Sequence, residues 1–75
     1  MTKPNYIDKA IGAKIRLHRR TRETSIGLLS KKIGKSYQQF QNYETGKNKV
    51  SASILFRIAS FLGYPINKFF PENEN

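Results

Sequence analysis

Three segments of this chain begin with a serine and end with a glycine, and this arrangement constrains the fold more than any other feature. The segments are Ser25 to Gly34, Ser36 to Gly46 and Ser51 to Gly63. A serine hydroxyl accepts hydrogen bonds from the free N–H groups at the start of a helix, and glycine adopts the left-handed backbone that ends many helices. The pattern predicts helices over Ile26–Ile33, Tyr37–Thr45 and Ala52–Leu62.

Two further helical segments flank these three. Ile7, Ile11, Ile15 and His18 have the spacing of one helix face, which predicts a first helix from Ile7 to Thr21. The segment "PINKFF" predicts a last short helix starting at Pro65, because proline favours the first turn. No segment alternates between apolar and polar residues as a strand does. The expected fold is all-α: a compact five-helix bundle over residues 7–70, between a flexible arm (residues 1–6) and a flexible acidic tail (residues 71–75).

The charge of the chain is strongly positive. Fourteen Lys and Arg oppose five Asp and Glu, which gives a formal net charge of +9. Two of the five acids, Glu72 and Glu74, lie in the last four residues, so the predicted bundle is more basic than the total indicates. A basic domain of this kind favours a polyanionic partner.

Several classes of protein are disfavoured by composition. The chain has no cysteine, which removes disulfides, thiolate catalysis and sulfur-containing zinc sites. No apolar run approaches the roughly 20 residues of a membrane span, and the N-terminal segment lacks the apolar stretch of a signal peptide. His18 is the only histidine and has no nucleophile to pair with. We expect a cytoplasmic protein that is not an enzyme and has no metal, cofactor, membrane or evident small-molecule ligand.

The two helices on either side of Gly34 carry the functional signal. Two short helices joined by a short turn with glycine form a helix-turn-helix, in which the second helix enters the DNA major groove. On that second helix, Gln38, Gln41, Asn42 and Thr45 share one arc, opposite Phe40 and Tyr43. Asn and Gln side chains pair with adenine edges, and Tyr37 at the helix start can also reach a base. Base contact is therefore favoured over an ordinary solvated face.

Glu44 is the exception on this helix. It points about 40° from Phe40 and about 160° from Asn42, so it faces the core. A partly buried carboxylate needs a partner, and Arg19 follows Ile15 by one turn on the first helix. We predict a salt bridge between Arg19 and Glu44.

Three motifs give the chain a family resemblance. They are "I-R-x-x-R" from Ile15 to Arg19, "Y-E-x-G-K" from Tyr43 to Lys47, and "L-x-x-I-A-x-x-L-G" from Leu55 to Gly63. With these motifs, residues from about 7 to 70 resemble the lambda-repressor-like helix-turn-helix domain, also called the Cro/repressor type or XRE family. The resemblance implies a five-helix DNA-binding domain that usually acts as a dimer, with the Arg19 and Glu44 positions paired.

The resemblance also implies contacts by position. Base contacts fall on Tyr37, Gln38 and Asn42, with weaker candidates at Gln39 and Gln41. Phosphate contacts fall on Ser25, Lys47 and Lys49. We add Lys35 and Ser36, which come directly before the helix that starts at Tyr37. Ile26 stands where the family often has a phosphate-contacting glutamine, so that contact is not expected here.

The apolar C-terminal segment predicts a dimer contact rather than simple core filling, made by Tyr64, Ile66, Phe69 and Phe70. We therefore predict a regulator of transcription that binds double-stranded DNA sequence-specifically, as a repressor and as a homodimer on an inverted-repeat operator. The alternatives are an antitoxin or protein-interaction module with secondary DNA binding, and an RNA or general polyanion binder.

Overall fold

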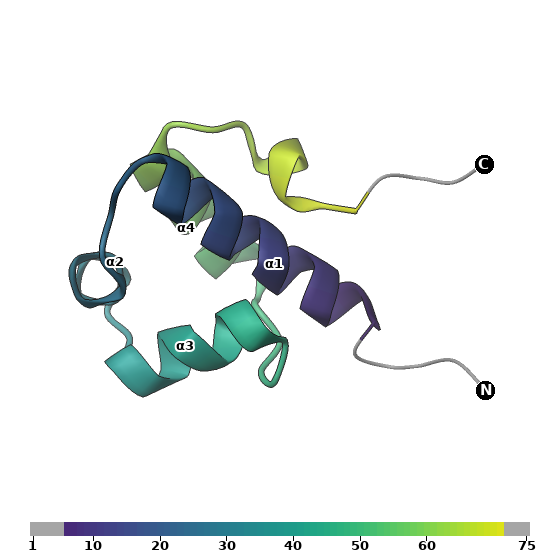
Figure 1. The fold of residues 1–75 in the computed structure, drawn as a ribbon, viewed down its shortest axis with the longest axis horizontal. Coiled ribbons are helices and arrows are strands. Elements are labelled where there is room, and N and C mark those ends of the chain that lie inside the picture. Colours follow the sequence, from purple (N-terminus) through teal and green to yellow (C-terminus); the bar gives the residue numbers. More distant parts are fainter. Residues whose placement is uncertain (1–5, 72–75) are drawn as a thin grey trace.

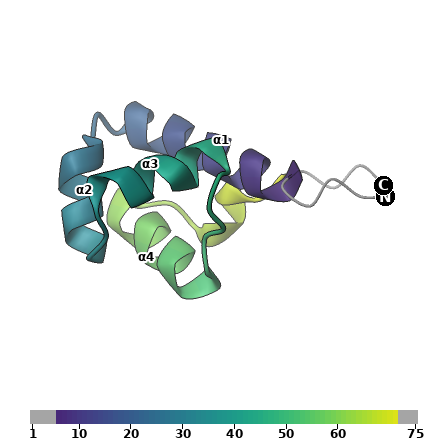
Figure 2. The same ribbon diagram turned by 90° about the horizontal axis from the view of Figure 1, so that it is seen from below.

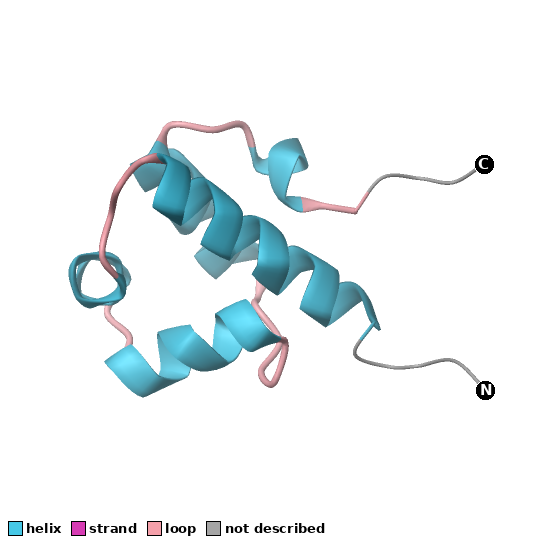
Figure 3. Cartoon of the chain, viewed as in Figure 1, coloured by secondary structure: helices cyan, strands magenta, loops and turns pink. Residues whose placement is uncertain are grey.

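The structure is a computed structural model that describes residues 6–71. It contains α1 (Tyr6–Thr21), α2 (Ile26–Ile33), α3 (Tyr37–Thr45), α4 (Ala52–Leu62) and the 3-10 helix η1 (Ile66–Phe69). No strand occurs within residues 6–71, and every connection between helices is a short loop (Figure 3). The prediction of an all-α helix-turn-helix fold is confirmed, and α1 begins one residue earlier than expected.

The predicted fifth α-helix is wrong. The segment has only four residues, and its N–H groups bond three residues back: Lys68 to the Pro65 carbonyl at 3.0 Å and Phe70 to the Asn67 carbonyl at 3.5 Å. So short a segment is too small for a stable α-turn series and takes the tighter 3-10 form. The domain therefore has four α-helices and one 3-10 turn. The predicted arm and tail lie outside the described residues, except for Tyr6, which opens α1, and Pro71.

The helix ends of α2, α3 and α4 follow from the serine and glycine pairs. The Oγ atoms of Ser25, Ser36 and Ser51 accept hydrogen bonds of 3.0 to 3.2 Å from N–H groups three residues later. Gly34, Gly46 and Gly63 end these helices with φ values of 74°, 81° and 81°. Because both signals are local, the predicted bounds of all three helices agree with the structure.

The helices pack around one core. In Figure 1, α1 crosses the centre, α3 and η1 lie on opposite sides of it, α4 lies behind it, and α2 closes one end. Figure 2 shows the same arrangement from the α3 side. The core residues are Ile11, Ile15, Leu29, Ile33, Phe40, Tyr43, Leu55, Ile58, Ala59, Leu62 and Phe69. Ile7, which the helical spacing placed inward, is exposed near the start of α1.

Candidate nucleic-acid interface

The turn between α2 and α3 holds the two helices in a fixed relation. It consists of Gly34, Lys35 and Ser36. The N–H of Gly34 bonds to the Lys31 carbonyl at 3.2 Å, and the N–H of Lys35 bonds to the Ser30 carbonyl at 2.9 Å. These bonds tie the turn to the last turn of α2, and Ser36 then caps α3. The start of α3 is therefore set by backbone geometry.

The predicted base contacts all lie on α3, which the turn presents to solvent. Tyr37, Gln38 and Gln41 are exposed, whereas Gln39 and Asn42 are partly buried. Gln38 Nε2 donates a hydrogen bond of 3.1 Å to Asn42 Oδ1 across one helical turn. This bond leaves the Gln38 carbonyl oxygen and the Asn42 NH₂ group available for another partner. An acceptor and a donor held side by side can pair with a base edge.

The predicted phosphate contacts form two groups. Ser25 and Ser36 use their oxygens as caps, so each hydroxyl keeps only its hydrogen for a phosphate. Lys47 and Lys49 are exposed in the loop after α3, and Lys49 Nζ lies 3.8 Å from Asp8 Oδ2. Lys35 is partly buried in the turn. The lysines of the loop are thus more accessible than Lys35.

A salt bridge joins the inner face of α3 to α1. Arg19 Nε lies 2.6 Å from Glu44 Oε2, and Arg19 Nη2 donates to Glu44 Oε1 at 3.2 Å. Arg19 Nη1 also donates to the Thr24 carbonyl at 2.8 Å. The two side chains are only 13% and 5% exposed. The salt bridge predicted from the sequence is present and joins α1, the loop before α2, and α3.

Aromatic packing completes the inner face of α3. The ring centroids of Phe40 and Tyr43 lie 6.1 Å apart in an edge-to-face arrangement. Burial raises the pKa of the Tyr43 phenol above its ordinary value of 10.0, because the charged form loses solvation. Tyr43 therefore acts in α3 as an apolar core residue that stays neutral.

The predicted dimer contact is largely buried. Phe69 is 0% exposed and belongs to the core, and Tyr64 and Ile66 are partly buried against it. The His18 ring lies 4.2 Å from the Tyr64 ring and 4.8 Å from the Phe69 ring, and His18 Nε2 is 3.0 Å from the Lys68 carbonyl oxygen. Of the four predicted residues only Phe70, at 45%, is exposed. Phe69 is therefore not a surface contact, because η1 folds back onto α1 and α4.

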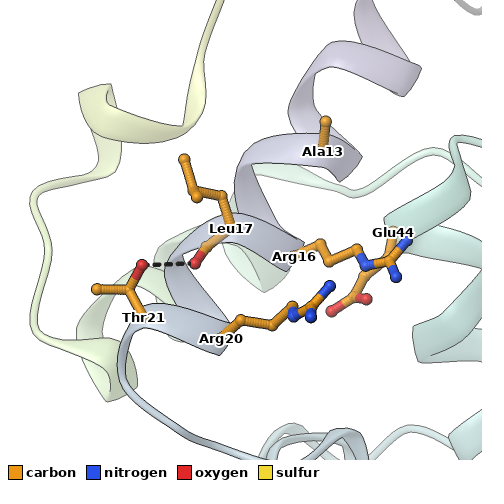
Figure 4. A pocket seen from close by; sticks show the side chains of 6 residues that line it. All are labelled: Ala13, Arg16, Leu17, Arg20, Thr21 and Glu44. Carbon is orange, nitrogen blue, oxygen red and sulfur yellow. Dashed lines mark hydrogen bonds between the residues drawn. The ribbon is translucent and has the colours of Figure 1, made fainter.

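Two surface features were not predicted as sites. Phe56 and Phe61 are 60% and 42% exposed on α4, and with Lys32 and Arg57 they line a groove of about 380 Å³ beside α2. A hollow of about 510 Å³ lies on α1, where Arg16 and Arg20 extend beside Glu44 (Figure 4). The two arginines are four residues apart in the sequence, and this helical spacing was the signal that could have marked them as a pair.

Within residues 6–71, no three His, Cys, Asp or Glu residues gather closely enough to hold a metal ion. Of the helices in residues 6–71, none combines the length and apolar character needed to cross a membrane.

Two helices joined by a glycine turn, with the second presenting amides outward, define a helix-turn-helix domain. A helix-turn-helix family model matches residues 15–69. An uncharacterized HTH-type transcriptional regulator of Sinorhizobium medicae is 42% identical over an alignment of 74 positions, which covers 93% of this chain and 50% of that protein. An uncharacterized transcriptional regulator in the ATPase CF(0) region of Rhodospirillum rubrum is 39% identical over 70 residues, 93% of this chain and 65% of that protein.

Among solved structures, the DNA-binding domain of BldD matches with a TM-score of 0.79 and 26% identity, covering 95% of this chain and 100% of that one. The chain belongs to the helix-turn-helix family, and its resemblance to the lambda-repressor-like members is confirmed. It spans half to two thirds of the length of the two relatives described above.

Proposed function

We propose that this chain binds double-stranded DNA sequence-specifically and regulates transcription. The observation that carries the proposal is the amide pair of Gln38 and Asn42, which α3 holds outward on a helix-turn-helix. The positive charge supplies attraction to phosphates, Lys47 and Lys49 lie exposed in the loop that follows α3, and the amides discriminate among bases. The two relatives named as transcriptional regulators support the same function.

The finer part of the proposal is a repressor that acts in the cytoplasm as a homodimer. Two copies related by a two-fold axis place their α3 helices about 34 Å apart on one face of the duplex. The operator is then an inverted repeat, and bound protein blocks polymerase. We propose no catalytic activity for the protein, since the role of the α3 surface is binding.

Selection of bound duplexes from a random DNA pool tests this function. The expected outcome is a short half-site that occurs twice in inverted orientation, at a spacing of about 10 base pairs or a multiple of it. The selected duplex should be bound about 4 to 10 kcal/mol more tightly than a scrambled one. Enrichment without a shared motif, together with equal binding of RNA, would instead indicate a general polyanion binder.

A second candidate is an interaction module, such as an antitoxin, in which DNA binding is secondary. The exposed Phe56 and Phe61 side chains favour it, because exposed aromatics lining a groove are typical of protein contacts. Copurification of a stoichiometric second chain, lost on Phe56→Ser substitution, would support this candidate. If the Phe56→Ser variant still binds the selected duplex with native affinity, the surface for the second chain is distinct from the DNA-binding surface.

A further inference from the structure

The outer side of α1 carries two arginines that the helix-turn-helix pair does not include. Arg16 and Arg20 lie one helical turn apart and are both exposed. Neither makes an ion pair within residues 6–71, and Glu44, which lines the same hollow, is already held at both oxygens by Arg19. The two guanidinium groups are therefore available to a ligand.

These two side chains converge on one place. Both line the hollow of about 510 Å³ between α1 and α3, and their guanidinium groups extend toward the end of α3 that bears Glu44 (Figure 4). Arg16 also lines an adjoining hollow of about 150 Å³ together with Gln41 and Thr45. Gln41 and Thr45 belong to the outward side of α3. The arginine pair thus continues the candidate DNA surface from α3 onto α1.

The net positive charge around the two hollows favours an anionic ligand. Three guanidinium groups, those of Arg16, Arg19 and Arg20, face one carboxylate, that of Glu44, so two positive charges have no counterpart there. A guanidinium matches phosphate oxygens with two parallel hydrogen bonds. The major groove is about 12 Å wide and bordered by phosphates, so a helix inside it has phosphates beside its neighbouring elements.

We propose that Arg16 and Arg20 form a phosphate-binding site that holds the DNA backbone alongside α3. This inference rests on the proposed DNA-binding function and adds α1 to the surface that meets DNA. A contact from α1 is offset from the phosphate contacts of the turn and the loop after α3. It therefore restrains the rotation of α3 about its own axis in the groove, and it does so regardless of base sequence.

The test compares Arg16→Gln, Arg20→Gln and the double variant with Arg57→Gln as a matched control. Arg57 is also an exposed helical arginine, but it lies at the groove between α2 and α4. Affinities for the selected and the scrambled duplex are measured between about 50 and 200 mM salt. The slope of log K against log salt is negative, and each lost phosphate contact reduces its magnitude by about 0.9. We expect a decrease of about 1.8 per bound domain for the double variant, the same on both duplexes, and none for Arg57→Gln.

Other outcomes overturn the proposal. If the double variant has the same salt slope as Arg57→Gln, the arginine pair contacts no phosphate. If its affinity falls on the selected duplex alone, the pair contacts bases instead. Arg16→Lys keeps the charge without the two-pronged donor, so its slope should stay and its affinity should fall. Failure of the proposed function is distinct: the native protein would then not distinguish selected from scrambled duplex, while the slopes on scrambled duplex still decide the site.

Discussion

A single guanidinium determines where the inner side of α3 sits. Arg19 contacts Glu44 through two nitrogens and the Thr24 carbonyl through the third, so one side chain spans α1, the following loop and α3. Both charges are largely shielded from water. Each charge needs the other, because an unpaired charge that is largely shielded from water would lower the stability of the fold.

Removal of Glu44 should therefore destabilise the domain. Glu44→Ala leaves Arg19 shielded without its partner, and we expect the free energy of unfolding to fall by about 3 kcal/mol in urea denaturation. Replacing both residues with apolar ones, Arg19→Met with Glu44→Leu, should recover part of this loss, because neither charge then remains unpaired. An unchanged midpoint for Glu44→Ala would mean that the salt bridge makes no net contribution.

Gly12 matters for a steric reason at the same crossing. A Cβ built on it would lie 2.6 Å from the Glu44 carbonyl oxygen, so α1 and α3 approach through backbone contact. Gly12→Ala should lower the free energy of unfolding by about 1 to 3 kcal/mol despite alanine's higher helix propensity. Gly27→Ala is the control, since a Cβ there would meet only Ser25 Oγ at 3.9 Å. It should be neutral or stabilising, by up to about 1 kcal/mol, and equal effects of the two would contradict the close approach.

The ends of helices depend on backbone conformation, and two of them allow a direct comparison. Gly34 and Gly46 both have positive φ, but only at Gly46 would a Cβ come close to another helix, at 2.7 Å from Lys9 Cα. Gly34→Ala should cost about 1 kcal/mol through φ alone. Gly46→Ala should cost more, because α1 must also shift. Thermal melting of both variants tests this order, and the reverse order would refute it.

The outward side of α3 makes a different prediction, about discrimination rather than stability. Gln38→Ala or Asn42→Ala should weaken binding to the selected duplex by about 1 to 3 kcal/mol and change binding to a scrambled duplex little. The double variant should lose less than the sum, since each amide orients the other through their hydrogen bond. Fluorescence anisotropy titrations of both duplexes measure this. Equal losses on both would show that these amides do not distinguish bases.

The accuracy of the sequence predictions varies along the chain for a physical reason. Ser36 and Gly46 fix the ends of α3 through contacts within a few residues, so sequence alone was sufficient there. Glu44 was predictable because helix geometry fixes its direction. Phe61 and Phe69 are chemically alike, yet one is exposed and the other fully buried. That difference depends on where η1 folds back, which no local pattern encodes.

Within residues 6–71, two acids lie close to cations from distant parts of the chain. Asp8 lies 3.8 Å from Lys49, and Glu44 is bonded to Arg19. Both pairs connect α1 to α3 or to the loop that follows it. The shielded Arg19–Glu44 pair holds α3 on α1, whereas the Asp8–Lys49 pair is long and its lysine is exposed, so it contributes little.

Phe69 and Phe70 at the end of η1 are neighbours in sequence, but one is buried and the other exposed, so their substitutions should have different effects. Phe69→Ala removes a fully buried ring and should lower the free energy of unfolding by about 3 to 5 kcal/mol. Phe70→Ser removes an exposed one, so dilute protein should unfold within about 0.5 kcal/mol of the native chain.

If Phe70 lies in a homodimer contact, Phe70→Ser should weaken binding to a duplex with two half-sites and leave binding to a single half-site unchanged, because only the former requires both copies. Sedimentation of the free protein and titration of both duplexes provide the measurement. Equal affinity of Phe70→Ser and native protein for the two-site duplex would remove Phe70 from the contact. The exposed aromatics of α4, Phe56 and Phe61, would then be the next residues to substitute in the same measurement.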